Sequence, residues 1–172
     1  MIVLGIDPGT AITGYGVVKG DRSAPPYLLE CGIIRTKPRD ALASRLQEIH
    51  AGVTELILRH RPDALSIEDV FYARNVRTTI VLGHARGVIL LAAANARLEI
   101  AEYPPAEIKK AVVGTGAATK EQVQFMVARI LRLKTAPQPS DASDGVAAAL
   151  AHIMGAGVPS MRDPFASLGV RK

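Results

Sequence analysis

The chain has 172 residues, of which 48% are hydrophobic and 22% charged, and its formal net charge is +5. This length and composition fit one globular domain and exclude a disordered chain. Its single cysteine, Cys31, excludes an intrachain disulfide, and an aromatic content of 4% argues against a base-stacking platform. No signal peptide is visible, and the apolar run 88–94 is far shorter than the about 20 residues that span a bilayer. We therefore expect a cytoplasmic protein that does not enter a membrane.

Short apolar runs bounded by Gly and Pro predict three strands near the start of the chain, at 2–7, 15–19 and 27–36. Their short links favour an antiparallel meander. A period of 3.6 residues then predicts an amphipathic helix over 40–61, followed by a fourth strand over 64–69. Because a helix separates this strand from the first, the two can lie parallel through a right-handed crossover.

The second half of the chain is mostly helical. We expect a loop at 70–75, a helix at 76–95, a strand at 98–103, and helices at 105–113, at 120–133 capped by Thr119, and at 141–154 capped by Ser140. The helix over 76–95 is rich in small and apolar residues, so we expect it to be buried or to lie in a subunit interface. The expected fold class is α/β, with a five-stranded mixed sheet of antiparallel and parallel strands flanked by helices. Residues 1–156 would form the domain and 157–172 a loosely ordered tail.

Two of the predicted strands deliver a carboxylate to the edge of the sheet. The first strand ends on Asp7, after which the chain turns through Pro8 and Gly9, and Glu68 lies near the end of the fourth strand. Asp is depleted in strands and is seldom buried without a partner, and ligands of α/β sheets sit at strand ends. Asp-Pro-Gly is also ordinary turn chemistry, so Asp7 alone does not separate a turn from a metal ligand.

Asp141 and Asp144 are spaced i and i+3 at the start of the last predicted helix, which puts both on one face. The helix dipole also favours acidic residues there, by about 0.3–1 kcal/mol each. With the two strand-end carboxylates they make a set of four that would repel one another without cations. Mg²⁺ suits such oxygen ligands. Two ions about 3.5–4 Å apart, bridged by Asp7, would form the arrangement that cuts phosphodiesters in line.

Six motifs follow one another along the chain. They are GIDPGT-x3-GYGV at 5–17, SRLQEIHAGVTELI at 44–57, IEDVF at 67–71, LGHARGV at 82–88, VVGTG at 112–116 and DASD at 141–144. Through these motifs the chain resembles the RuvC family of Holliday-junction resolvases, within the RNase H-like nucleases, over nearly its whole length. The resemblance implies an RNase H-like domain.

The resemblance also implies an activity and a set of partners. It implies a homodimer that binds a four-way DNA junction and nicks two strands symmetrically, leaving 5′-phosphate and 3′-hydroxyl ends, and that works with a branch-migration motor of the RuvA-RuvB type. It implies two Mg²⁺ per subunit, with Mn²⁺ as a substitute. The catalytic and metal-binding positions correspond to Asp7, Glu68, Asp141 and Asp144. The DNA-binding positions correspond to Phe71, Arg74, Lys109 and Lys120.

Three alternative functions stay open at this point. An actin-like or sugar-kinase-type ATPase also opens on an Asp-x-Gly-Thr turn, but it needs a second lobe and a second phosphate loop that this sequence lacks. A non-catalytic junction-binding protein would not need four carboxylates facing phosphate. An RNase H-like enzyme acting on RNA is the third. Phe71 could instead be a core residue, and Lys109 and Lys120 could be ordinary solvated charges.

Overall fold

The structure is a computed structural model that describes residues 1–21, 24–69 and 76–155. A sheet of five strands, in the order β3-β2-β1-β4-β5, lies at its centre. The elements in chain order are β1 (Ile2–Asp7), β2 (Ile12–Asp21), β3 (Ala24–Arg35), α1 (Leu42–His60), β4 (Ala64–Glu68), α2 (Val76–Asn95), β5 (Glu99–Tyr103), α3 (Pro105–Val113), α4 (Lys120–Ile130) and α5 (Ser140–Ile153). The expected fold class is confirmed.

The direction in which neighbouring strands pair, parallel or antiparallel, follows from the length of the chain segment that joins them. β1, β2 and β3 form an antiparallel meander, whereas β4 pairs parallel to β1, and β5 parallel to β4, after helical connections. Parallel neighbours need a crossover of this kind, while antiparallel strands can be joined by a short turn. β1 therefore lies between an antiparallel and a parallel neighbour, with both faces covered.

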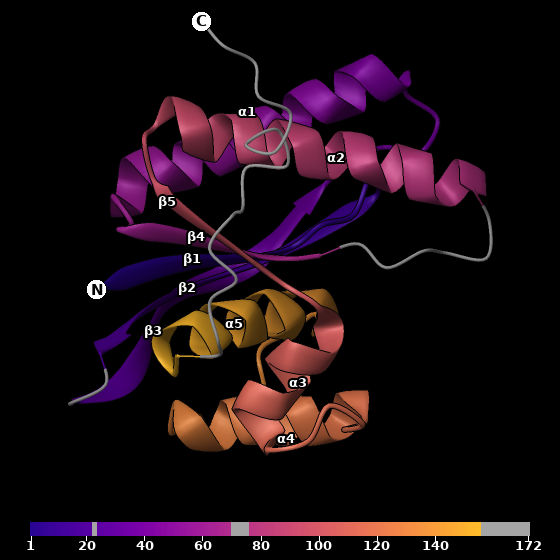
Figure 1. Ribbon diagram of the computed structural model, residues 1–172. Helices are drawn as coiled ribbons and strands as arrows, with labels where there is room; N and C mark the ends of the chain where they lie inside the picture. The colour runs from indigo at the N-terminus through magenta and orange to yellow at the C-terminus, as the bar shows by residue number, and fades with distance from the viewer. Residues whose placement is uncertain (22–23, 70–75, 156–172) are drawn as a thin grey trace, which may run out of the picture.

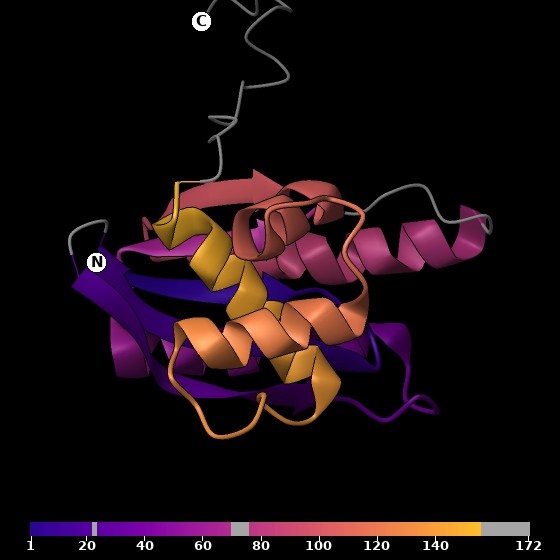
Figure 2. The same ribbon diagram turned by 90° about the horizontal axis from the view of Figure 1, so that it is seen from below.

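Helices cover the two faces of the sheet unequally (Figure 1). α1 and α2 lie together on one face, and α5 lies on the other with α3 and α4 outside it. Seen from below, α5 crosses the sheet obliquely and lies between the sheet and α4 (Figure 2). The core is divided accordingly. One apolar cluster includes Leu4, Ile49 and Ile89 beneath α1 and α2, and the other includes Val3, Tyr103 and Leu150 beneath α5.

Several helices and strands begin or end at other residues than predicted. β2 extends from residue 12 to 21, rather than from 15 to 19, because it is bonded to a neighbour on each side along most of its length. The prediction that Ser140 caps the last helix is wrong, since Pro139 is the N-cap and Ser140 is already helical. α4 ends at Ile130, because Arg132 takes the left-handed conformation with φ 54°. The Thr119–Gln122 capping box is present as predicted.

α2 has the length and composition of a helix able to cross a membrane, alone among the helices in the described ranges. It nevertheless packs on α1 and β5 as part of the domain, burying Ala85, Ile89 and Ala93. Its polar residues include Arg77, His84 and Arg86. The opposite side exposes Val76, Ile80 and Leu91. The predicted tail lies outside the described residues.

Candidate active site

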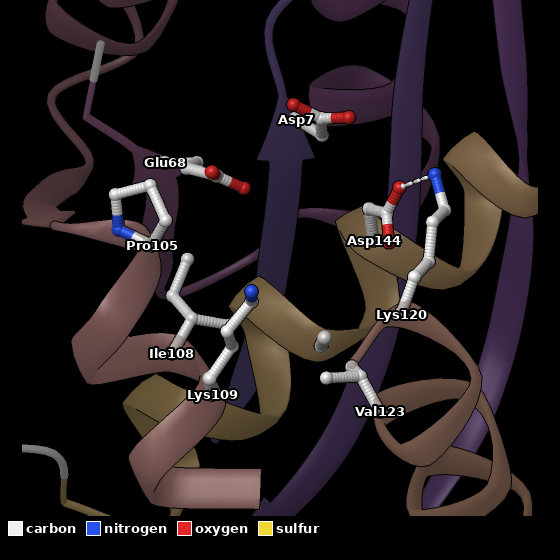
Figure 3. A pocket seen from close by; sticks show the side chains of 9 residues that line it. Asp7, Glu68, Pro105, Ile108, Lys109, Lys120, Val123 and Asp144 are labelled. Atoms are coloured by element: carbon white, nitrogen blue, oxygen red, sulfur yellow. Dashed lines mark ion pairs between the residues drawn. The ribbon is translucent and has the colours of Figure 1, made fainter. Parts of the chain in front are cut away.

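The carboxylate of Asp7 is placed by the end of the central strand. Asp7 is the last residue of β1 and pairs with Gly14 of β2 on its antiparallel side. On its parallel side, Ile6 is in register with Ile67, so the next residue of β4, Glu68, leaves the sheet at the same edge. The sequence prediction that two strands bring carboxylates to one edge is confirmed. Figure 3 shows both side chains among the residues that line one cavity.

α5 approaches this edge unusually closely because glycines line its path. A Cβ atom on Gly14 would lie 1.9 Å from the carbonyl oxygen of Asp141, and one on Gly145 would lie 2.5 Å from the Cα of Tyr15. Such contacts are possible only for residues without a side chain. The Ser66 hydroxyl donates a 2.6 Å hydrogen bond to the carbonyl of Ala148, which ties α5 to β4. The first turns of α5 are therefore held against the end of β1.

Asp141 and Asp144 reach the site from these first turns. Asp7, Asp141 and Asp144 each offer a carboxylate oxygen within 4.8 Å of the others. Glu68 is not in this close group, but it lines the same cavity of about 220 Å³ as Asp7 and Asp144. The structure thus brings the four predicted carboxylates to one region, three of them near enough to share one cation and Glu68 at the cavity wall.

Two lysines line the same cavity as the carboxylates. Lys109 comes from α3, and Lys120 is the first residue of α4. The Nζ of Lys120 lies 2.7 Å from Oδ2 of Asp144 (Figure 3). The Thr119–Gln122 capping box fixes the start of α4 and so the position of this lysine. Apolar side chains of Ile108 and Val123 form the floor between the charged groups.

Burial and mutual repulsion make these carboxylates reluctant to ionise. Burial, followed by the charges of Glu68, Asp144 and Asp141, raises the pKa of Asp7 to about 7. Burial and then the charge of Asp144 raise the pKa of Glu68 to about 7, although Lys109 and Lys120 oppose this. Burial also raises the pKa of Asp144, against the pull of Lys120. The two lysines therefore compensate only part of the negative charge.

This donor set fits divalent cations. All four side chains offer hard oxygen atoms, which Mg²⁺ and Mn²⁺ prefer. The raised pKa values show that the metal-free site carries more negative charge than its surroundings stabilise, which a cation would correct. The residues that would hold it are Asp7, Asp141 and Asp144, with Glu68 across the cavity.

Two of the predicted DNA-binding residues, Phe71 and Arg74, lie outside the described residues. A residue that sequence reasoning missed is Arg86 of α2. Its guanidinium pairs with Asp69, which follows Glu68, at 3.2 Å, and with Glu102 of β5. It thereby ties the carboxylate-bearing end of β4 to α2. The motif at 82–88 contains it, but a sequence motif does not show which carboxylates an arginine will meet.

A mixed sheet with carboxylates on adjacent strand ends and on a helix crossing beneath them is typical of metal-dependent nucleases of the RNase H-like class. The model of the family "Crossover junction endodeoxyribonuclease RuvC" matches residues 3–152. The chain belongs to the RuvC family of crossover junction endodeoxyribonucleases.

Individual proteins and structures that are similar to this chain include RuvC proteins. The RuvC protein of Pelotomaculum thermopropionicum is 48% identical over 154 residues, covering 88% of this chain and 92% of the relative. The structure of Thermus thermophilus RuvC superposes with a TM-score of 0.83 at 39% identity, covering 91% of this chain and 95% of that one. A second structure, T. thermophilus RuvC in complex with a Holliday junction substrate, gives 0.83 at 36% identity with the same coverage.

Proposed function

We propose that this protein resolves four-way DNA junctions by metal-dependent nicking of two strands, leaving 5′-phosphate and 3′-hydroxyl ends. The observation that carries the proposal is the group of Asp7, Asp141 and Asp144 oxygens within 4.8 Å of one another, with Glu68 on the same cavity. Family membership and the junction complex of the T. thermophilus relative support the choice of DNA substrate.

In this proposal the four carboxylates are the catalytic residues and the metal ligands. Two Mg²⁺ per subunit, replaceable by Mn²⁺, would lower the pKa of the attacking water and stabilise the negative charge on the leaving oxygen. Asp7, whose pKa feels the charges of all three other carboxylates, would be shared between the two ions. Glu68 would complete the ligand set from the cavity wall, where a bound cation would favour its ionised form.

The two lysines would position the DNA strand. Lys109 and Lys120 line the cavity with the carboxylates, so a phosphate entering it meets both the two cations and the proposed metal ligands. When metal and DNA are bound, Lys120 would exchange Asp144 for the phosphate backbone. Phe71 completes the proposed DNA contacts on the basis of the motif that ends at residue 71, and Arg74 on the basis of the resemblance to the RuvC family alone.

We further propose a homodimer formed through α2. Its outer side exposes Val76, Ile80 and Leu91, and a Cβ on Gly83 or Gly87 would find nothing within 4 Å in the described part of the chain. Glycine costs about 1 kcal/mol in a helix interior, so two glycines on an open face favour close approach of a second chain. A two-fold dimer would place two sites on two strands of a two-fold junction. A cytoplasmic complex with a RuvA-RuvB type motor belongs to the same proposal.

The deciding experiment is cleavage of a four-way junction with and without Mg²⁺ by the wild type and by Asp7→Asn. We expect Asp7→Asn to bind the junction and to lose cleavage by about 10³-fold or more, because several kcal/mol of charge stabilisation disappear. Glu48→Gln, at an exposed site on α1, is the matched control and should cleave like the wild type. Metal-independent cleavage, or stronger cleavage of an RNA/DNA hybrid, would overturn the proposal.

A further inference from the structure

The loop after β3 lies on the same edge of the sheet as the carboxylates. β1 and β3 both run antiparallel to β2, and Asp7 is in register with Gly14 while Arg35 is in register with Ile12. The chain therefore leaves β3 on the side where Asp7 ends β1. Two strand spacings of about 4.8 Å separate the two strands, so this loop begins about 10 Å from the catalytic edge.

A buried threonine fixes this loop to the turn that follows Asp7. Thr36 is only 3% exposed. Its N–H donates to the carbonyl of Ala11 at 3.1 Å, and its hydroxyl donates to the carbonyl of Thr10 at 2.6 Å. The same hydroxyl accepts a 3.0 Å hydrogen bond from Nε of Arg45 on α1. One side chain thus holds the loop, the turn and an arginine of a neighbouring helix in fixed relation.

The residues around Thr36 are strongly basic. Arg35, Lys37 and Arg39 are exposed, and within the described ranges no carboxylate lies in ion-pair distance of any of them. Asp40 is the one acidic residue of this loop, and its N–H closes a turn onto the carbonyl of Lys37. Elsewhere, Arg59 pairs with two carboxylates, as Arg86 does.

From this we infer that Arg35, Lys37, Arg39 and Arg45 form a basic strip that binds the phosphate backbone of the junction a few nucleotides from the cut. The inference rests on the proposed function and adds a second DNA contact to it, on the β3 side of the carboxylates and away from Lys109 and Lys120. Phosphates follow one another by about 3.4 Å of helix axis on each strand, so 10 Å corresponds to about three nucleotides. Unpaired cations on a rigid loop suit a polyanion, because little ordering is required on binding.

The test compares Lys37→Gln/Arg39→Gln with Arg61→Gln/Arg97→Gln. Both double variants remove two exposed positive charges, but Arg61 and Arg97 lie at the opposite edge, where β1 and β5 begin. Affinity for a four-way DNA junction is measured without divalent metal over a series of salt concentrations. We expect the strip variant to bind about tenfold more weakly at low salt and to reduce the slope of log K against log salt by about 1.8. The control should keep the wild-type slope.

Each outcome separates this inference from the proposed function. Wild-type protein that binds and cuts junctions, together with a strip variant of unchanged salt slope, would overturn the basic strip alone. Equal loss of slope in both variants would also overturn it, because the effect would then reflect net charge and not position. Failure of the wild type to bind junctions would overturn the proposed function and the strip with it.

Discussion

At the catalytic edge, Asp7 and Glu68 share a cavity with a third carboxylate, Asp144, whereas Glu30 on β3 lies among hydrogen-bond donors. Glu30 accepts hydrogen bonds from the Tyr15 hydroxyl at 2.9 Å and from Nη1 of Arg59 at 2.9 and 3.0 Å. The Nε2 of His60 lies 2.7 Å from Oε2 of Glu30. Burial alone would raise the pKa of Glu30, but these partners lower it. The pKa of Asp7 instead rises to about 7.

The contrast shows that the neighbours of a partly buried carboxylate decide whether its ionised form is stable. Around Glu30 the chain supplies hydrogen-bond donors and the Arg59 cation, so the charge of Glu30 joins β3 to α1 and needs no ion from solution. Around Asp7 the chain supplies less positive charge than the carboxylates need, which leaves the deficit to a ligand. Changes that remove either carboxylate should therefore have effects of opposite sign on the stability of the metal-free protein.

The largest effect should come from displacing α5 from the sheet. Gly14→Ala would place a Cβ 1.9 Å from the carbonyl oxygen of Asp141, and backbone cannot yield as a flexible side chain does. We expect the free energy of unfolding, measured with urea, to fall by about 3 kcal/mol or more. Stabilisation by Mg²⁺ should also weaken, since Asp141 and Asp144 would move away from Asp7. An unfolding free energy within 1 kcal/mol of the wild type would contradict the close packing.

Asp7→Asn should stabilise the metal-free protein at pH 8, by on the order of 1–3 kcal/mol, because it removes a charge that burial and neighbours disfavour. The folded-state pKa of Asp7 is raised from 3.8 to about 7. Its favourable contribution is therefore complete below pH 4 and is lost as the pH rises through 7. The difference in unfolding free energy between variant and wild type should grow over this interval. Added Mg²⁺ should stabilise only the wild type, and an equal response of both proteins would argue against Asp7 as a ligand.

Glu30→Gln should act in the opposite direction and more weakly. The amide keeps the shape but loses the charge that Arg59 and His60 face, so we expect a loss of about 1–2 kcal/mol at pH 7. Because the pKa of Glu30 is lowered in the folded state, its contribution is present above its unfolded value and disappears as the pH falls. Chemical denaturation at pH 7 and pH 3 checks both points. A variant as stable as the wild type at pH 7 would show that the contacts between Glu30 and its partners contribute nothing to the free energy of unfolding.

The sequence predicted the carboxylate edge well, because strand ends and helix starts are local features. Asp7 and Glu68 follow apolar runs, and the i, i+3 spacing of Asp141 and Asp144 fixes their common face. The partners of Glu30 were not predicted, since Tyr15, Arg59 and His60 meet it only through the pairing of β2 with β3 and the packing of α1. Arg86 and Thr36 were missed for the same reason. Long-range contacts of single polar side chains leave no periodic signal in a sequence.

The smallest effect should come from Lys120→Gln, which leaves even less positive charge to balance the carboxylates at the catalytic edge. The lysine pairs with Asp144 at 2.7 Å but is about half exposed, so its contribution to charge balance is modest. Without DNA, the variant should bind Mg²⁺ or Mn²⁺ about two- to fivefold more tightly by calorimetry, because a competing cation has gone. With junction DNA, the salt slope of binding should fall by about 0.9, as one phosphate contact disappears. Arg132→Gln, an exposed residue beyond the end of α4, is the control and should change neither quantity. Weaker metal binding by Lys120→Gln would mean that the lysine orients Asp144 for the metal and does not compete with it.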